Sequence, residues 1–212
     1  RVADCAFNTQ QTIAAMQRAA ADGVQLAVFP ELGLTGYTCG DLFFQQPLQR
    51  AAARGLAAVL EASADLDLVA LVGLPVTVDG KLYNCAAVVC HGKLLGLVPK
   101  TYLPNYGEFY ERRQFNPAPA GVRTLHFAGQ EVPFGTQLLF RCAEMPEFCL
   151  GVEVCEDLWA PLPPSTHHAL AGATVIANLS ASDETIGKAD YRRALVSQQS
   201  ARLLCAYLYA DA

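Results

Sequence analysis

Apolar residues recur along the chain at two spacings, one typical of helices and the other typical of strands. The helical spacing predicts helices over 9–23, 47–65, 163–173 and 188–204. Apolar and β-branched runs predict strands over 24–31, 66–78, 81–90, 93–100, 122–127, 131–135, 136–141, 147–155, 174–180 and 205–210. Helices that take turns with strands in this way predict one α/β domain.

Two tight turns indicate that part of the sheet structure is antiparallel. Asp79-Gly80 and His91-Gly92 each separate two predicted strands by two residues, which is the spacing of a β-hairpin. We therefore expect mixed sheets whose outer faces are covered by helices, layered as an α-β-β-α sandwich.

One long segment has neither spacing. Residues 101–121 mix aromatic, charged and proline residues without apolar periodicity. Long irregular loops inside compact domains are usually functional, so we expect this loop to take part in a site.

The composition favours a soluble, well-packed body. The 212 residues are 52% hydrophobic and 17% charged, and single α/β domains of ~200–250 residues are common. A net charge of −5 without a basic run argues against nucleic acid and anionic membranes as partners. No apolar run approaches the ~20 residues that span a bilayer.

The cysteines do not form a metal or redox motif. They stand at 5, 39, 85, 90, 142, 149, 155 and 205, and no two have C-x-x-C spacing. Free cysteine is usually a small buried hydrophobe, so all except Cys155 are interpreted as reduced core residues. Reduced cysteines indicate a reducing compartment such as the cytoplasm, and no metal site is expected.

Both ends of the sequence indicate a longer polypeptide. The first residues enter a helix with no strand before it, and the last residues complete a strand. We therefore expect residues 1–212 to be one domain of that polypeptide.

Three predicted strands lead into a residue that could take part in catalysis: Glu31, Lys100 and Cys155. Sites in open α/β sheets form beyond the carboxyl ends of the strands. The acids Glu156 and Asp157 would raise the pKa of the Cys155 thiol unless a cation such as Lys100 lies beside it. A short helix that begins after Cys155 would also favour a thiolate and help to hold an oxyanion.

Each candidate also has an ordinary structural interpretation. Glu31 alone could be a loop or helix-start carboxylate, and Lys100 alone a solvated charge. Arg112 and Arg113 more often form surface or structural ion pairs than substrate contacts.

Two further features are ambiguous or favour a structural role. His167 and His168 diverge by ~100° in a helix and are expected on the surface. Trp159 is as consistent with a core wall as with a binding residue.

Three segments together resemble a known superfamily. "FPELGLTGY", "VPKTYLPNYGEFYERRQF" and "GVEVCEDLW", in this order, resemble the nitrilase or carbon–nitrogen hydrolase superfamily, whose members use a Glu-Lys-Cys triad. Within it the segments "YLPNYGEFYERRQF", "CEDLW" and "NLSAS" are most similar to the glutaminase domains of glutamine-dependent NAD synthetases. The resemblance covers nearly the whole chain.

The resemblance implies a role for each candidate. Glu31 would be the general base, Lys100 the cation that stabilises the oxyanion, and Cys155 the nucleophile. Glu111 would be the second glutamate, which orients the lysine, although Glu108 lies only one helical turn away. The glutamine pocket would be lined by Tyr106, Glu156, Trp159 and Ser182.

The implied reaction is hydrolysis of the glutamine side-chain amide through a cysteine thioester, which releases ammonia for NAD synthesis. This domain would need no cofactor. ATP and Mg²⁺ are expected only for a synthetase domain, whose glycine-rich pyrophosphate loop is missing from these residues. The implied partners are that synthetase domain and further copies of the chain in a homo-oligomer.

Two alternatives remain open on the sequence. A stand-alone amidase or nitrilase of the same superfamily would act on another amide, nitrile or carbamoyl amine. A catalytically idle domain would serve only as an oligomerisation scaffold, although all three triad positions are intact.

Overall fold

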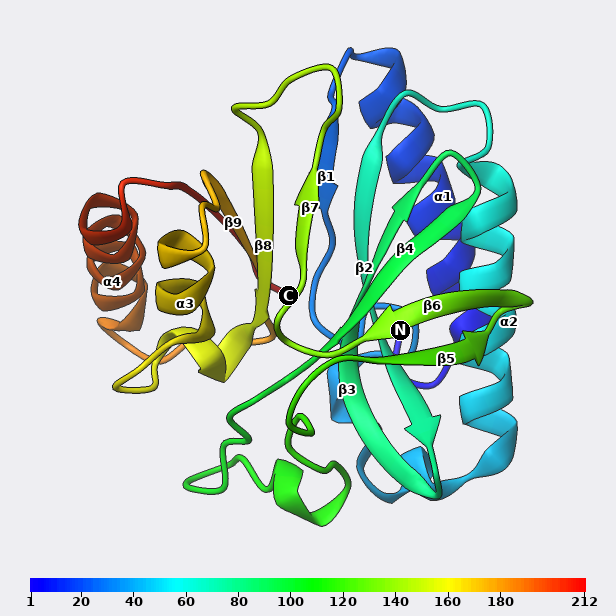
Figure 1. The fold of residues 1–212 in the computed structure, drawn as a ribbon. Coiled ribbons are helices and arrows are strands. Elements are labelled where there is room, and N and C mark those ends of the chain that lie inside the picture. The colour runs from blue at the N-terminus through cyan, green and yellow to red at the C-terminus, as the bar shows by residue number, and fades with distance from the viewer.

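Two β-sheets lie face to face between two helical layers in the computed structural model, which describes all of residues 1–212 (Figure 1). One helical layer contains α1 (Cys5–Ala21) and α2 (Gln46–Ala62), and the other contains α3 (Pro164–Leu170) and α4 (Lys188–Leu203). The predicted α-β-β-α sandwich with mixed sheets is confirmed.

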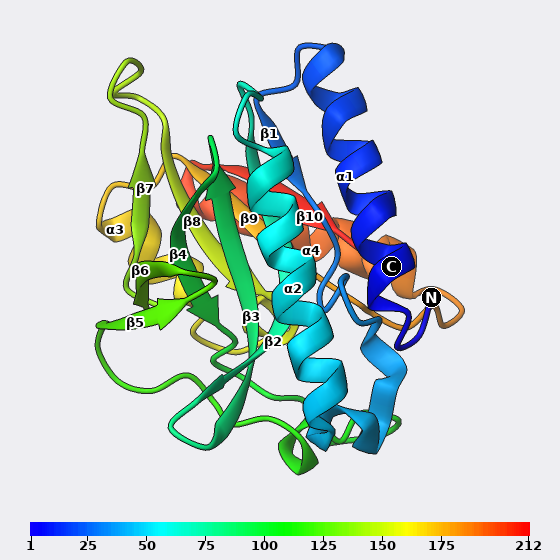
Figure 2. The same ribbon diagram turned by 90° about the vertical axis from the view of Figure 1, so that its right-hand side faces the viewer.

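The larger sheet is covered by α1 and α2, as Figure 2 shows. Its strands run in the order β1-β2-β3-β4-β6-β5. Their bounds are β1 (Leu26–Val28), β2 (Val69–Val78), β3 (Lys81–Cys90), β4 (Lys93–Pro99), β5 (Arg123–Phe127) and β6 (Gln130–Phe134). Both predicted hairpins form, and in each turn both central residues have positive φ, which is the requirement of a type I′ turn.

The smaller sheet brings several strand ends to one edge. It contains β7 (Leu139–Arg141), β8 (Cys149–Val154), β9 (Val175–Leu179) and β10 (Ala206–Ala210), in the order β10-β9-β8-β7. The strands β8, β9 and β10 are parallel, and their last residues are register partners. The residues that follow them therefore lie side by side.

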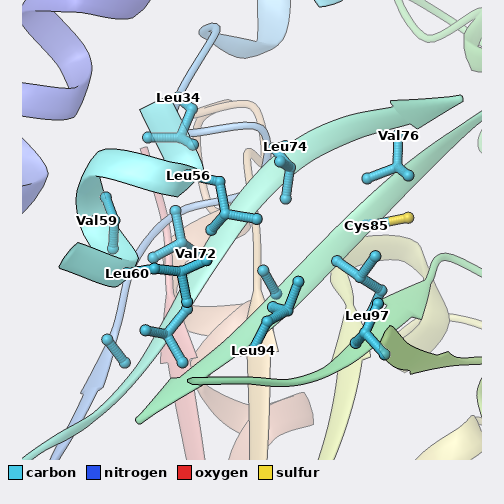
Figure 3. Close-up of a cluster of buried hydrophobic side chains, with 14 of the residues drawn as sticks. Leu34, Leu56, Val59, Leu60, Val72, Leu74, Val76, Cys85, Leu94 and Leu97 are labelled. Carbon is cyan, nitrogen blue, oxygen red and sulfur yellow. The ribbon is translucent and has the colours of Figure 1, made fainter. Parts of the chain in front are cut away.

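Both faces of the strands β2, β3 and β4 are buried, which explains their almost continuous apolar sequences. Alternate residues of β2, including Val72 and Leu74, pack with Leu56 and Val59 of α2 on one face (Figure 3). Leu71 points the other way and packs with Val152 and other residues of the smaller sheet. The period of two in the strand thus divides one apolar run between two cores.

Some boundaries differ from the sequence predictions. Helix α1 begins at Cys5, because the Asp4 carboxylate accepts the Phe7 N–H at 3.1 Å and caps the helix. The 3₁₀ segment η1 (Tyr37–Phe44), in which two short helical pieces are joined at a kink, was not predicted. The predicted strand over 24–31 is shortened to the three residues of β1.

Two predictions about side-chain exposure are wrong. His168 is buried, and its Nε2 contacts the Thr136 carbonyl at 2.8 Å. Its ring fits against Gly151, where a Cβ would lie only 2.8 Å from the histidine Cβ. Cys142 is exposed, not part of the core, although all eight cysteines are free.

The paired-charge interpretation of Arg113 holds, since its guanidinium donates to both oxygens of Asp41 at 2.7 and 2.8 Å. None of the helices has the length and apolar character needed to cross a membrane.

Candidate active site

The three predicted triad residues meet where the ends of the two sheets adjoin. Lys100 follows β4 directly and Cys155 follows β8, while Glu31 lies three residues after β1. The segment after β9 joins them: the Glu31 N–H donates to the Ser180 carbonyl at 3.2 Å, and the Ser180 hydroxyl lies 3.2 Å from the Cys155 sulfur. The expected assembly at strand ends is therefore what the structure has.

Lys100 is held between two buried carboxylates. Its Nζ donates to Oε1 of Glu31 and to Oε1 of Glu111, each at 2.6 Å. The exposed fractions of the three residues are 0%, 2% and 4%, in that order. Glu108 is exposed, so the geometry favours Glu111 as the second glutamate.

Glu31 has the environment of a base that works near neutrality. Its Oε1 also accepts from Asn84 Nδ2 at 2.6 Å, and its Oε2 accepts the Ala181 N–H at 3.1 Å. Burial raises the pKa of this carboxyl to about 7; Lys100 opposes the rise and the charge of Glu111 adds to it. A group with such a pKa can both accept and return a proton at physiological pH.

Lys100 remains charged in this setting. Burial alone would lower its pKa, but the negative charges of Glu31 and Glu111 outweigh burial and raise the pKa well above the ordinary value. The Tyr37 hydroxyl donates to the same Oε1 of Glu111 at 2.7 Å, while Oε2 has no hydrogen-bond partner. Tyr37 thereby fixes the carboxylate that holds the lysine.

Cys155 is a protonated thiol at rest. The side chain is buried, and burial raises its pKa, with a further rise from Glu31 that Lys100 only partly opposes. The sequence suggested that a neighbouring lysine would stabilise a thiolate, but that ammonium is already shared by two carboxylates. The arrangement instead provides a thiol with a base of suitable pKa beside it.

The two acids after Cys155, Glu156 and Asp157, have different hydrogen-bond partners. The buried Asp157 carboxylate accepts the backbone N–H groups of Thr101, Tyr102 and Val154 at 2.8–3.0 Å, so it ties the end of β8 to the loop after Lys100. Glu156 accepts the Tyr106 hydroxyl at 2.9 and 3.0 Å.

The nucleophile candidate sits in a sharp backbone turn. Cys155 has φ of 45°, and the predicted short helix begins there as the 3₁₀-helix η3 (Cys155–Leu158). The Cys155 N–H donates to Asn178 Oδ1 at 2.9 Å and is therefore occupied. The next N–H along the chain, that of Glu156, lies in the first turn of η3, where backbone N–H groups have no acceptor within the helix.

A cavity of about 230 Å³ opens onto Cys155. Besides the cysteine, its lining includes every predicted pocket residue: Tyr106, Glu156, Trp159 and Ser182. A larger cavity of about 840 Å³ between α1 and the loop after β9 reaches Glu31 but not Cys155. Of these two cavities, only the smaller one contains the sulfur.

Sequence reasoning missed three residues of this cavity: Pro104, Phe109 and Lys188. Lys188 pairs with Asp183, and its Nζ lies 5.3 Å from the ring centroid of Trp159 and 5.8 Å from that of Phe109. It is the first residue of α4, and no local motif distinguishes it from an ordinary surface lysine.

The pocket thus carries both signs of charge. Glu156 is half-buried, and burial raises the pKa of its carboxyl. Tyr106 is 59% exposed, and burial of its hydroxyl together with the bond to Glu156 raises the Tyr106 pKa to about 12. No group of three or more His, Cys, Asp and Glu side chains gathers in a way that could hold a metal ion.

An α-β-β-α sandwich with this lysine, cysteine and pair of glutamates at one edge has the architecture of the nitrilase superfamily. An amidase from Nesterenkonia sp. has this fold, with a TM-score of 0.75 at 21% identity over 100% of this chain and 72% of that one. The family model for carbon-nitrogen hydrolases matches residues 1–210, and the chain belongs to this family.

Two relatives narrow the likeness. Glutamine-dependent NAD(+) synthetase of Mycobacterium tuberculosis is 47% identical over 211 residues, which are 100% of this chain and 31% of that protein. The crystal structure of a glutamine-dependent NAD(+) synthetase from Cytophaga hutchinsonii matches with a TM-score of 0.88 and 31% identity, over 100% of this chain and 34% of that one. The chain spans about a third of the length of these relatives.

Proposed function

We propose that the chain hydrolyses the side-chain amide of glutamine to glutamate and ammonia, and that the ammonia serves glutamine-dependent NAD synthesis. One observation carries the proposal: Cys155 shares its cavity with an acid, Glu156, and a cation, Lys188. These are the charges needed to hold the two ends of an amino-acid zwitterion. The two synthetase relatives give the same reading independent support.

Acylation uses the buried base. Glu31 accepts the thiol proton as the Cys155 sulfur attacks the amide carbon of glutamine. The oxyanion is held by the Lys100 ammonium and the Glu156 N–H. Glu31 then gives its proton to the leaving nitrogen, so ammonia departs and a thioester remains.

Deacylation uses the same base, with water as the attacking group. Glu31 takes a proton from the water that attacks the thioester carbonyl, and the same proton returns to the sulfur as the carbon–sulfur bond breaks. Glutamate leaves and the resting thiol is restored. Glu111, held by Tyr37, keeps the Lys100 ammonium in place through both steps.

Recognition of glutamine depends on the cavity walls. Glu156 accepts the α-ammonium and Lys188 pairs with the α-carboxylate, as charge-assisted hydrogen bonds. The aromatic walls formed by Trp159 and Phe109 pack against the aliphatic stem. Ser182 and Tyr106 complete the wall and offer hydroxyl groups to the polar ends.

The partner in this proposal is a synthetase unit that consumes the ammonia. ATP and Mg²⁺ belong to that unit, because every step at Cys155 uses only groups of this chain and water. Further copies of the chain in a homo-oligomer are the remaining proposed partner.

Ammonia release from a substrate panel tests the proposal. Glutamine should be hydrolysed with a much higher kcat/KM than propionamide, butyronitrile or N-carbamoyl amino acids. A preference for an uncharged amide or nitrile would support the stand-alone amidase instead. No ammonia from any of them, together with no labelling of Cys155 by a glutamine-mimicking electrophile, would support the idle scaffold.

A further inference from the structure

The helix-covered face of the smaller sheet carries a buried polar network directly beneath the nucleophile. Glu153, Asn178 and the hydroxyl of Tyr207 lie on neighbouring strands there, and the first two are completely buried. Buried polar groups cost stability unless they are paired. The paired network at this place therefore indicates a role in holding the backbone next to it.

Asn178 holds the Cys155 peptide groups on both sides. Its Oδ1 accepts the Cys155 N–H at 2.9 Å, and its Nδ2 donates to the Cys155 carbonyl at 3.4 Å. Cys155 has φ of 45°, a left-handed conformation that is uncommon for a residue with a side chain and persists only when its surroundings hold it. The two hydrogen bonds supply that restraint.

Tyr207 and Glu153 decide which way the Asn178 amide faces. The Tyr207 hydroxyl donates to Glu153 Oε1, and Glu153 Oε2 accepts the Ser165 N–H of α3 at 2.8 Å. Because the tyrosine proton is committed to Glu153, its oxygen can only accept, and it accepts from Asn178 Nδ2 at 3.2 Å. The amide oxygen is thereby turned toward the Cys155 N–H.

We propose that Asn178 is a positioning residue that locks Cys155 in the left-handed turn and so aims the Glu156 N–H at the oxyanion, with Tyr207 and Glu153 fixing the amide orientation. The inference rests on the proposed amide hydrolysis, because only a reaction with an oxyanion needs this donor. It explains why the Cys155 N–H is used for structure while the next N–H remains for chemistry.

Two variants and a matched control test the inference. Asn178→Leu removes both bonds to Cys155 at similar size, and Tyr207→Phe removes only the hydroxyl that orients the amide. The control is Thr174→Val at the other end of the same strand pair. It removes a hydroxyl that accepts from the Cys149 N–H at 3.0 Å and donates to the Glu147 carbonyl at 2.6 Å. If the leucine variant does not fold, the tyrosine variant carries the test.

The expected result is a split between kcat and KM. Loss of one oxyanion donor lowers kcat by about 100-fold, so Asn178→Leu should approach that loss and Tyr207→Phe should lose about tenfold. In both variants the KM for glutamine should stay within about twofold of the parent's value. In the control, kcat and KM should both stay within the same range.

A second readout separates oxyanion alignment from general damage. Methyl methanethiosulfonate transfers a methylthio group to the thiol sulfur and expels methanesulfinate, without any oxyanion on carbon. Its rate at Cys155, followed by peptide mass mapping, should fall far less than kcat in both variants. An equal fall of the two rates would overturn the inference, because it would place the defect in the thiol itself.

The outcomes distinguish this inference from the proposed function. Unchanged kcat in both variants overturns the role of Asn178 and leaves glutamine hydrolysis standing. If the parent protein hydrolyses another amide in preference to glutamine, the loss of kcat is measured with that amide. It is again compared with the loss of the methylthiolation rate at Cys155, and the same two outcomes apply. A parent that hydrolyses no amide overturns both.

Discussion

The charged cluster around Lys100 and the cavity at Cys155 differ in burial and in how their side chains are held. Lys100, Glu31 and Glu111 are almost completely buried, and every charge in the cluster has a partner at hydrogen-bond distance. The cavity walls come from loops and the start of α4, and Tyr106 is more than half exposed.

The difference indicates a division of labour. In the proposed mechanism, the buried and mutually paired charges keep a fixed geometry and would act on any amide carbon placed before them. The partly exposed charges of the cavity, Glu156 and Lys188, would decide which molecule is placed there. Changes in the cluster should therefore affect all substrates alike, and changes in the cavity should affect glutamine selectively.

The largest effect is expected from Cys155→Ser. The hydroxyl cannot replace the thiol as nucleophile, so kcat should fall by at least about 10⁴-fold for every amide. The fold should persist, which thermal unfolding of both proteins checks. Turnover above background would show that another group is the nucleophile.

The next largest effect is expected from Lys100→Ala, with Lys93→Ala at the exposed start of β4 as a control. Loss of the oxyanion cation should lower kcat by at least about 100-fold for glutamine and propionamide alike. Two buried carboxylates would lose their partner, and breaking a buried pair costs about 3–5 kcal/mol of unfolding free energy.

Lys100→Ala should also slow alkylation of Cys155, because the ammonium has the largest effect among the groups that lower the thiol pKa. Peptide mapping must follow the reaction, since Cys142 is exposed. Alkylation at the normal rate with failed hydrolysis would mean that Lys100 acts on the transition state alone.

The pH profile tests Glu31 as the base. Its carboxyl must be ionised to accept the thiol proton, and its pKa is about 7. The value of kcat/KM should therefore rise about tenfold per pH unit below 7 and level off above it. Glu31→Gln should remain at background at every pH; a flat profile for the parent between pH 5 and 8 would contradict this assignment.

The smallest effect, and the most selective, is expected from Glu156→Ala. Loss of a hydrogen bond to the α-ammonium should lower kcat/KM for glutamine about tenfold, as is typical for charged partners. A short uncharged amide should be almost unaffected, and the exposed Glu108→Ala serves as the control. An equal loss of kcat/KM on both substrates would mean that Glu156 acts in catalysis or in the stability of the fold, and not in recognition of glutamine.

The sequence predicted the fold well because its strands and helices are marked by local signals. The type I′ turns, the apolar runs and the loop over 101–121 are each visible within a few residues. The 3₁₀-helix over Tyr37–Phe44 lacks such a signal. The burial of His168 depends on Gly151, which belongs to a different element.

The site was predictable in part for the same reason. Glu31, Lys100 and Cys155 stand at strand ends inside recognisable motifs, so their assembly could be anticipated. Lys188 could not be singled out, because it contacts Phe109 and Trp159, which are distant in the sequence. Asn178 begins the segment "NLSAS", but its contacts with Cys155 depend on the pairing of β9 with β8. The sequence also could not show that Lys100 would be shared by two carboxylates, which leaves Cys155 as a protonated thiol.

Trapping the acyl intermediate shows whether Cys155 forms a covalent bond to the substrate. The protein is mixed with glutamine, quenched in acid within one turnover and digested. The mass of each cysteine-containing peptide is then measured by mass spectrometry. The proposed mechanism predicts a glutamyl thioester on Cys155, which hydroxylamine removes and which is absent from Cys155→Ser. Ammonia release without an acyl group on Cys155, or with the group on Cys142 instead, would contradict it.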